Sequence, residues 1–189
     1  MRYEKGRKDA TRQRITEVAS ERFRSGGIAA SGVASIMSDA GLTNGAFYPH
    51  FQSKEELVRE TVAAALDAQS VQIREALAAG GPDLAISLYL SAEHRDDPGQ
   101  GCASAALLPE LARQSSETRR LYTERLESQV RQLAAALPPQ TKDPEAVALG
   151  VFATVIGALQ LARAAAGTEL SDRILAAGAD AARALIRRS

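Results

Sequence analysis

An all-α fold is the prediction that this sequence supports best, and three observations lead to it. Alanine, the strongest helix former, occurs 37 times in 189 residues, whereas aromatic residues make up only 4% of the chain. Apolar residues recur at spacings of three and four along most of the chain, which is the period of an amphipathic helix. The one stretch with alternating polarity, residues 84–90, has no second such stretch to pair with, so no sheet is expected.

Two helices are predicted before the first tight turn. Residues 10–25 carry an apolar stripe and end at the pair Gly26-Gly27. Residues 32–40 follow Ser31, which we expect to cap the helix N-terminus with its hydroxyl. Gly41 should end this helix with a positive φ, because glycine adopts that conformation without a Cβ clash.

Two more helices follow the turn. A third helix begins at position 43 or 44 and is shortened or kinked at Pro49, because proline has no backbone N–H. Ser53 and Glu56 have the spacing of a capping box, so a fourth, long helix should begin there and end at Gly80-Gly81-Pro82.

The C-terminal part is predicted to be helical as well. Residues 84–90 are taken as a helix, and the polar segment 94–101 as a break. The remaining helices are expected at residues 102–114, 116–137, 143–166 and 170–188, which brings the total to about nine. We expect two domains: residues 1–52 with a basic arm at 1–9, and residues 53–189.

The charged residues restrict the possible partners. Lys plus Arg and Asp plus Glu both number 23, so the chain as a whole has no net field that would attract nucleic acid or a membrane. The N-terminus differs, because residues 1–14 hold six basic residues against two acidic ones. That segment either follows a DNA backbone or its minor groove, or is disordered.

Several classes of protein are disfavoured. One Cys excludes an internal disulfide framework, and two His with one Cys do not make a zinc site without carboxylates. We find no secretion signal and no long uncharged apolar span. We therefore expect a cytoplasmic protein with no membrane contact, no metal and no cofactor, and the absence of triad, phosphate-loop or HExxH patterns makes a helical enzyme the weakest alternative.

The first fifty residues have the spacing of a helix-turn-helix. Two short helices are joined by Gly41-Leu42-Thr43, and the second opens with small polar residues that allow close approach to a major groove about 12 Å wide. By spacing alone, an ordinary three-helix bundle fits equally well.

Specific residues favour the helix-turn-helix. They are Gly27-Ile28, Ser31-Gly32-Val33, Ile36, Ala40 to Thr43, Gly45, Phe47-Tyr48, His50-Phe51 and Ser53 to Leu57, together with Arg14-Ile15, Ala19 and Phe23 upstream. This pattern resembles the signature of the TetR/AcrR family of bacterial transcriptional regulators. The detailed resemblance covers about residues 10–60, and the rest of the chain agrees in length and helical class. Met37 and Pro49 depart from the family pattern, and Pro49 leaves the last turn of the second motif helix in doubt.

The resemblance implies a set of residues that contact DNA: Ser31, Gly32, Thr43, Asn44, Gly45, Tyr48, His50 and Lys54. Asn44 suits a bidentate contact to adenine, and Tyr48 and His50 suit donation to phosphate. Ser31 and Lys54 lie at helix N-termini, where an anion is favoured, although Ser31 as a plain cap and Lys54 as a solvated charge are the alternatives. Phe47 and Phe51 are expected in the core.

The last two helices are implied to form a homodimer interface. Its expected residues share one stripe on each helix: Gly150, Ala153, Gly157, Leu161, Leu175, Gly178, Ala182 and Leu185. The alternative is that these small residues pack the two helices against each other within one chain.

An effector pocket is expected between the long fourth helix and that interface. Its expected lining is Leu84, Leu88, Tyr89, Leu107, Leu108, Glu110, Leu111, Tyr122, Phe152, Ile156 and Gln160, an apolar wall with a few polar groups. Core packing is the alternative. Cys102 follows a glycine-rich turn at a predicted helix N-terminus, so redox sensing is a minor possibility beside simple burial.

Together these observations predict a sequence-specific DNA-binding transcriptional regulator. We expect a repressor that is released from a palindromic, double-stranded operator by a small, mostly apolar effector. The alternative is a DNA-binding or architectural dimer without an effector, which would lack a sizeable pocket in the C-terminal part.

Overall fold

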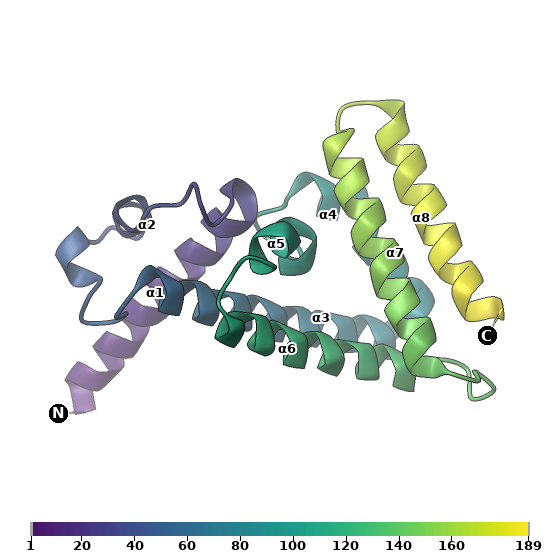
Figure 1. Cartoon of the computed structure of the whole chain (residues 1–189), viewed down its shortest axis with the longest axis horizontal. Coiled ribbons are helices and arrows are strands. Elements are labelled where there is room, and N and C mark those ends of the chain that lie inside the picture. The colour runs from purple at the N-terminus through teal and green to yellow at the C-terminus, as the bar shows by residue number, and fades with distance from the viewer. Residues whose placement is uncertain (1, 189) are drawn as a thin grey trace.

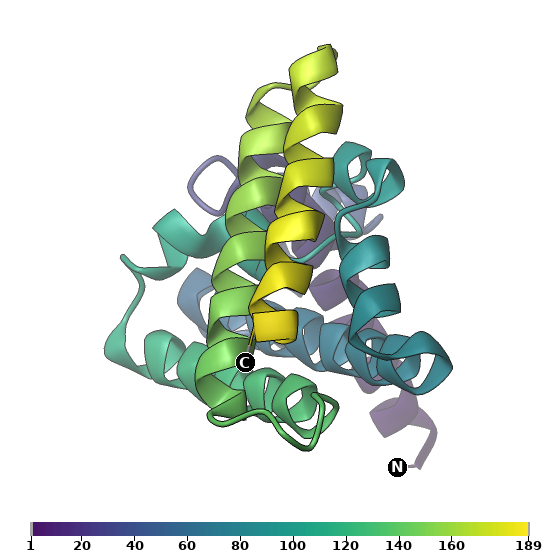
Figure 2. The ribbon, with the colours of Figure 1, turned by 90° about the vertical axis from the view of Figure 1, so that its right-hand side faces the viewer.

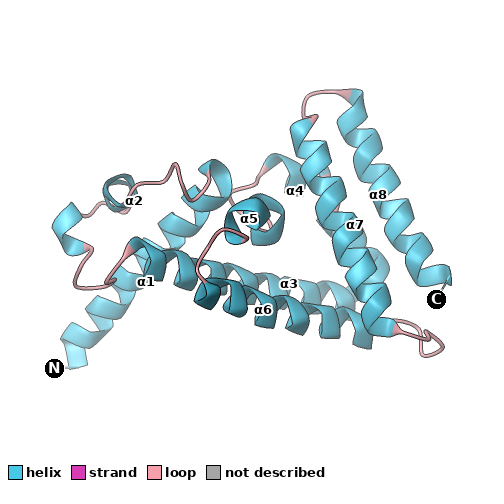
Figure 3. Ribbon diagram, viewed as in Figure 1, coloured by secondary structure: helices cyan, strands magenta, loops and turns pink. Residues whose placement is uncertain are grey.

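The computed structural model describes residues 2–188, with side chains from Gly6 onward, and every regular element in that range is helical (Figure 3). The elements are α1 (Arg2–Gly26), α2 (Val33–Asp39), the 3₁₀ turn η1 (Asn44–Ala46), α3 (Lys54–Tyr89), α4 (Ala92–Asp96), α5 (Ala103–Leu111), α6 (Ser116–Ala135), α7 (Pro144–Ala164) and α8 (Glu169–Arg188). The all-α prediction is confirmed.

The helices pack around two apolar clusters. α3 and α6 lie side by side, with α5 against them, and α7 and α8 form an antiparallel pair at the end distant from α2 (Figure 1; Figure 2). One cluster joins α1, α2 and the first half of α3 to α5, and the other joins the second half of α3 to α6, α7 and α8. α3 thus contributes to both clusters and connects the two ends of the molecule.

The expected basic arm is instead part of a helix. α1 begins at Arg2, and its second half places Ile15, Ala19 and Phe23 in the core with no exposed surface. Arg12 pairs with Glu56 and Glu60. An arginine that is held by two carboxylates of the same chain is not available to DNA phosphates, so part of the predicted basic surface is used internally.

The helix-turn-helix differs from the prediction in its second helix. Gly41 has φ +72° and its N–H donates to the carbonyl of Ser38, so α2 ends as predicted. After Thr43, however, the chain forms only the three-residue η1 and a further turn up to His50, not an α-helix. Pro49 offers no N–H to the carbonyl of Gly45, which explains why α-helical hydrogen bonds do not propagate here.

The N-terminal caps of α2 and α3 are partly as predicted. The N-cap of α2 is Gly32 without a side-chain bond, and Ser31 is buried with its hydroxyl donating to the Gly27 carbonyl at 2.8 Å, so the predicted Ser31 cap is wrong. Ser53 does cap α3, because its Oγ accepts from the N–H of Glu56 at 3.1 Å. The Glu56 carboxylate accepts from the amide of Gln52.

α3 reverses direction at two glycines. Gly80 and Gly81 leave the helical conformation, and Gly81 has φ +67°, where a side chain would be strained. The segment after this kink, which includes residues 84–90, is helical as predicted and folds back along the first part of α3. The predicted break at 94–101 contains the short helix α4 in its first part, where Ser91 supplies an N-cap by accepting from His94 N–H.

Candidate DNA-binding surface and effector pocket

Four of the predicted DNA contacts lie together on the surface of the helix-turn-helix. Thr43, Asn44 and Gly45 are exposed where η1 begins, and the Tyr48 side chain is 71% exposed. Tyr48 is held edge-on against the buried ring of Phe47, with 5.5 Å between ring centroids. Phe47 and Phe51 are buried and stacked, as expected for core residues, so they fix the loop from which Tyr48 projects.

The other four predicted contacts behave differently. Gly32 is exposed at the start of α2, but Ser31 is buried and its hydroxyl is occupied. Lys54 is half-buried, and its ammonium donates to the Ile28 carbonyl at 2.6 Å, which ties the start of α3 to the loop before α2. His50 is half-buried, and burial together with nearby Lys8 and Arg12 lowers the pKa of its imidazole. A neutral His50 still has a ring N–H to donate.

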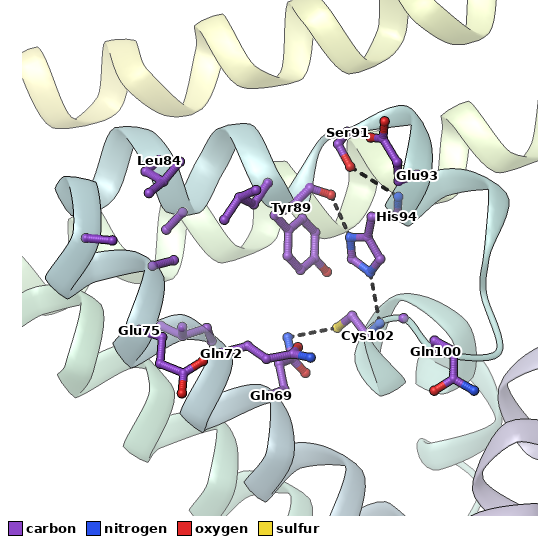
Figure 4. A pocket seen from close by; sticks show the side chains of 16 residues that line it. Gln69, Gln72, Glu75, Leu84, Tyr89, Ser91, Glu93, His94, Gln100 and Cys102 are labelled. Carbon is purple, nitrogen blue, oxygen red and sulfur yellow. Dashed lines mark hydrogen bonds between the residues drawn. The ribbon is translucent and has the colours of Figure 1, made fainter.

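A pocket of about 560 Å³ opens in the C-terminal part. Its walls come from the middle of α3, the segment of α3 beyond the kink, α4 and the turn before α5. Of the predicted lining residues, Leu84, Leu88 and Tyr89 are present in these walls. The side chains around the polar end are drawn in Figure 4.

The polar end of the pocket is organised by His94 and Cys102. The Nδ1 of His94 lies 2.7 Å from the Tyr89 carbonyl, and its Nε2 accepts from the N–H of Cys102 at 3.0 Å. The ring is therefore the tautomer with a proton on Nδ1, and burial lowers the pKa of this histidine. Cys102 is 4% exposed, and its thiol accepts from Gln69 Nε2 at 3.1 Å.

The remaining predicted pocket residues lie elsewhere. Leu107 and Leu111 are buried in the N-terminal cluster, Leu108 is exposed, and Tyr122 packs on that cluster while donating to Ser104. Phe152 belongs to the C-terminal cluster beside a void of about 40 Å³. Ile156 packs on the same cluster, and Gln160 donates to the Ala105 carbonyl. None of these seven residues of α5, α6 and α7 lines the pocket, because these helices pack most of them into or against the two apolar clusters.

Glu110 has a role that the sequence did not reveal. Its carboxylate lies outside the pocket and accepts from the backbone N–H groups of Ile28 at 3.1 Å and Ala29 at 2.9 Å. A second bridge runs from Arg24, whose Nε donates to the Gly99 carbonyl at 2.7 Å. The first contact joins the loop before α2 to the C-terminal end of α5, and the second joins α1 to the turn that leads to the pocket wall at Gly101 and Cys102.

The small-residue stripes on α7 and α8 separate into two faces. Leu175, Gly178 and Ala182 are buried within the chain, and a Cβ added at Gly178 would lie 2.4 Å from that of Ala158. These three positions pack α8 against α7, so the prediction that they form a dimer surface is wrong. Ala153, Leu161 and Leu185 are exposed, and Gly157 and Gly150 are partly exposed.

The structure also bears on two expectations, which are that the protein holds no metal and that it has no membrane-spanning segment. Within residues 2–188 no group of three or more His, Cys, Asp or Glu side chains is placed to hold a metal. α7 is the one described helix that is long and apolar enough to cross a bilayer, although helices of soluble cores share that property. Seven of its residues are buried against neighbouring helices, which identifies it as a core helix.

Sequence reasoning missed Gln69, Gln72 and Glu75 as pocket residues. The available signal was the pair Gln69 and Ile73, which continues the inward stripe of α3 through Leu66, so that a glutamine occupies a core position. His94 was missed as well. Its contacts with Tyr89 and Cys102 depend on the reversal at Gly80-Gly81, which a pattern of residues does not specify.

The fold and the exposed turn define a helix-turn-helix protein with a helical C-terminal part. Residues 15–61 match the model of the family described as bacterial regulatory proteins, tetR family. Among curated proteins there is no match. The helix-turn-helix segment is therefore similar to that of tetR-family regulators, and the whole chain has the fold of solved TetR-family regulators, which supports a role in DNA-binding regulation.

Solved structures share the whole fold at low identity. A TetR-family regulator from Cytophaga hutchinsonii is 21% identical, with a TM-score of 0.77 over 94% of this chain and 96% of that one. The reduced form of NemR from Escherichia coli is 20% identical, with a TM-score of 0.74 over 89% and 95%. FadR from Bacillus subtilis, solved with stearoyl-CoA, is 16% identical, with a TM-score of 0.69 over 92% and 97%.

Proposed function

We propose that the protein is a homodimeric repressor that binds a palindromic operator and is released by a small, largely apolar effector. The observation that carries this proposal is the pocket, because its wall at Gly101 and Cys102 continues into the segment that is hydrogen-bonded to α1. A structure with only a solid C-terminal core would favour the architectural dimer instead. FadR, which has this fold, was solved with stearoyl-CoA, so the fold accommodates an amphiphile.

The operator contacts are assigned to the exposed turn. Thr43, Asn44 and Gly45 present side chains and amides at the start of η1, and Tyr48 presents its hydroxyl beyond it. A single motif contacts few base pairs, so two copies related by a two-fold axis are needed to read a palindrome. Since η1 is short, base contacts are confined to these residues instead of extending along a long recognition helix.

The dimer is assigned to the exposed face of α7 with the outer side of α8. Leu149 and Leu161 are 51% and 62% exposed, and Leu170 of α8 is 53% exposed. Between them Gly157 has open space, with no described atom within 4 Å of an added Cβ. Large apolar side chains flanking a flat position fit a second copy of the same helix pair. The assembly would have about twice the 20.0 kDa of one chain.

The first experiment identifies the operator by selection from random double-stranded DNA and then compares variants by binding assays at one fixed salt concentration. Asn44→Ala should weaken binding by about 10-fold or more, because a bidentate base contact contributes about 1 to 3 kcal/mol. Tyr48→Phe should weaken it less, by loss of one phosphate contact. Gln140→Ala is the matched control, because Gln140 is exposed at the far end of the molecule.

Unchanged binding by both Asn44→Ala and Tyr48→Phe would contradict the assigned surface, provided that circular dichroism shows both variants folded. Selection of sequences without two-fold symmetry would contradict the palindromic operator.

A further inference from the structure

Two buried polar atoms at the deep end of the pocket have no nitrogen or oxygen hydrogen-bond partner among the described residues, although the weakly bonding thiol of Cys102 lies beside the second of them. They are Oε1 of Gln69, whose side chain is only 8% exposed, and the hydroxyl of Tyr89. Figure 4 shows both side chains at the same end of the cavity, next to Cys102. A buried polar atom without a partner costs free energy, so this end of the pocket is incomplete without a ligand or water that supplies the missing bonds.

The two atoms have different hydrogen-bonding capacities. Gln69 uses its amide N–H to bond the Cys102 thiol, which leaves Oε1 as an acceptor that requires a donor. Burial raises the pKa of the Tyr89 hydroxyl well above its usual value, so it keeps its proton and can donate. A head group that donates to Gln69 and accepts from Tyr89 satisfies both.

The charges around the pocket are unfavourable to an anion. None of the described residues that line the pocket is Lys or Arg, whereas the acidic residues Glu75 and Glu93 both line it. His94 has both ring nitrogens engaged, its Nε2 accepts a hydrogen bond and therefore carries no proton, and burial lowers the pKa of the ring. Two cations lie behind this wall and are engaged there: Arg163 donates to the carbonyls of His94 and Arg95, and Arg24 donates to the carbonyl of Gly99.

A cation is also poorly accommodated at the deep end. Glu75 and Glu93 are exposed to water, so neither is a buried partner for an ammonium group placed beside Gln69. A charge that moves there from water loses hydration without gaining a paired charge. Apart from the polar residues Gln72, Ser91 and Gln100, the rest of the cavity is lined by Gly101 and by six apolar side chains, which are Ile73, Ala76, Ala79, Leu84, Ala85 and Leu88.

We propose that this pocket takes an uncharged amphiphile whose head group is a hydroxyl or a primary amide. The head donates to Gln69 Oε1 and accepts from the Tyr89 hydroxyl, and the apolar body lies along α3 between Ile73 and Leu88. This inference rests on the proposed function, because it names the chemical class of the effector.

The test is titration calorimetry of the full-length protein with four probes that share one tail: 1-decanol, decyl methyl ether, decanoate and decylammonium, all below their micelle concentrations. 1-Decanol should bind at least about 10-fold more tightly than each of the others, since one hydrogen bond to an otherwise unpaired buried group decides the difference. Tighter or equal binding of decanoate, decylammonium or the ether would overturn the proposal, and so would the absence of 1-decanol binding.

Two variants separate the head-group contact from general packing. Gln69→Met keeps the side-chain volume but removes the acceptor, so 1-decanol should lose its advantage over the ether. Gln72→Met is the matched control, because Gln72 lines the same pocket but is exposed, and its 1-decanol affinity should be unchanged. A Gln69→Met protein that melts as the wild type does and still prefers 1-decanol would contradict the assigned contact.

The operator assay distinguishes the two proposals. If 1-decanol binds as expected but leaves operator affinity unchanged, the ligand class stands and the effector function fails. If decanoate or decylammonium binds in preference and releases the operator, the effector function stands and the ligand class is wrong.

Discussion

At the scale of single residues, the side chains that link the two ends of the molecule are the least predictable. Glu110 appears in the sequence as an ordinary charged residue of α5, yet its carboxylate accepts two backbone N–H groups from the loop before α2. That loop is also fixed by Lys54, whose ammonium donates a hydrogen bond to the Ile28 carbonyl. Each contact spans many positions along the chain, so local patterns give no sign of it.

Glu110→Ala should lower the free energy of unfolding by about 1 to 2 kcal/mol, because it leaves two backbone donors without their charged acceptor. Glu110→Gln should lower it less, since one carbonyl oxygen remains. The control is Glu127→Ala, because Glu127 is exposed and makes only a 3.7 Å pair with Arg131. Chemical denaturation measures all three variants, and a Glu110→Ala protein as stable as Glu127→Ala would show that the bridge is weak.

At the scale of elements, the sequence predicted helices well where one face is apolar and caps are local. The end of α2 at Gly41 and the Ser53 cap of α3 follow from chemistry within a few residues. The third predicted α-helix is only a short 3₁₀ turn, because the missing N–H of Pro49 has a stronger effect on the backbone than the apolar spacing of Phe47 and Phe51. Which neighbour a helix faces was not predictable, and the Gly178 stripe shows why, since small residues suit either an intrachain or an interchain contact.

This ambiguity yields a paired prediction for Gly157 and Gly178. Gly178→Leu should destabilise each chain by about 1 to 3 kcal/mol or more, because its added atoms would overlap Ala158. Gly157→Leu has open space within the chain, so it should leave the unfolding of a monomer unchanged and weaken dimerisation.

Sedimentation velocity at micromolar concentration measures the assembly, and thermal melting measures the fold. A wild-type protein that sediments as a monomer would refute the dimer, and a Gly157→Leu protein that remains dimeric would place the interface elsewhere.

At the scale of the whole molecule, α3 connects the DNA-binding surface to the pocket. Its first turn carries Lys54, and its middle supplies Gln69 and Ile73 to the pocket wall. A ligand seated against that wall therefore contacts the same helix whose N-terminus orients the helix-turn-helix. The turn before α5 provides a second connection through Gly99 and Arg24. Both routes are continuous packed structure, so a shift at one end has a mechanical path to the other.

Thermodynamic linkage between the ligand site and the operator site gives a quantitative prediction. If a ligand weakens operator binding by some factor, the operator must weaken ligand binding by the same factor, and a coupling of about 1 to 3 kcal/mol corresponds to about 5- to 150-fold. Ligand affinity should therefore be measured with and without saturating operator, at one salt concentration, because phosphate contacts make DNA affinity depend steeply on salt. In Glu110→Ala the two affinities should converge, since the contact that ties α5 to the loop before α2 is gone. Equal ligand affinities with and without operator in the wild type would mean that the pocket and the DNA surface are uncoupled, and would favour a DNA-binding dimer that no effector controls.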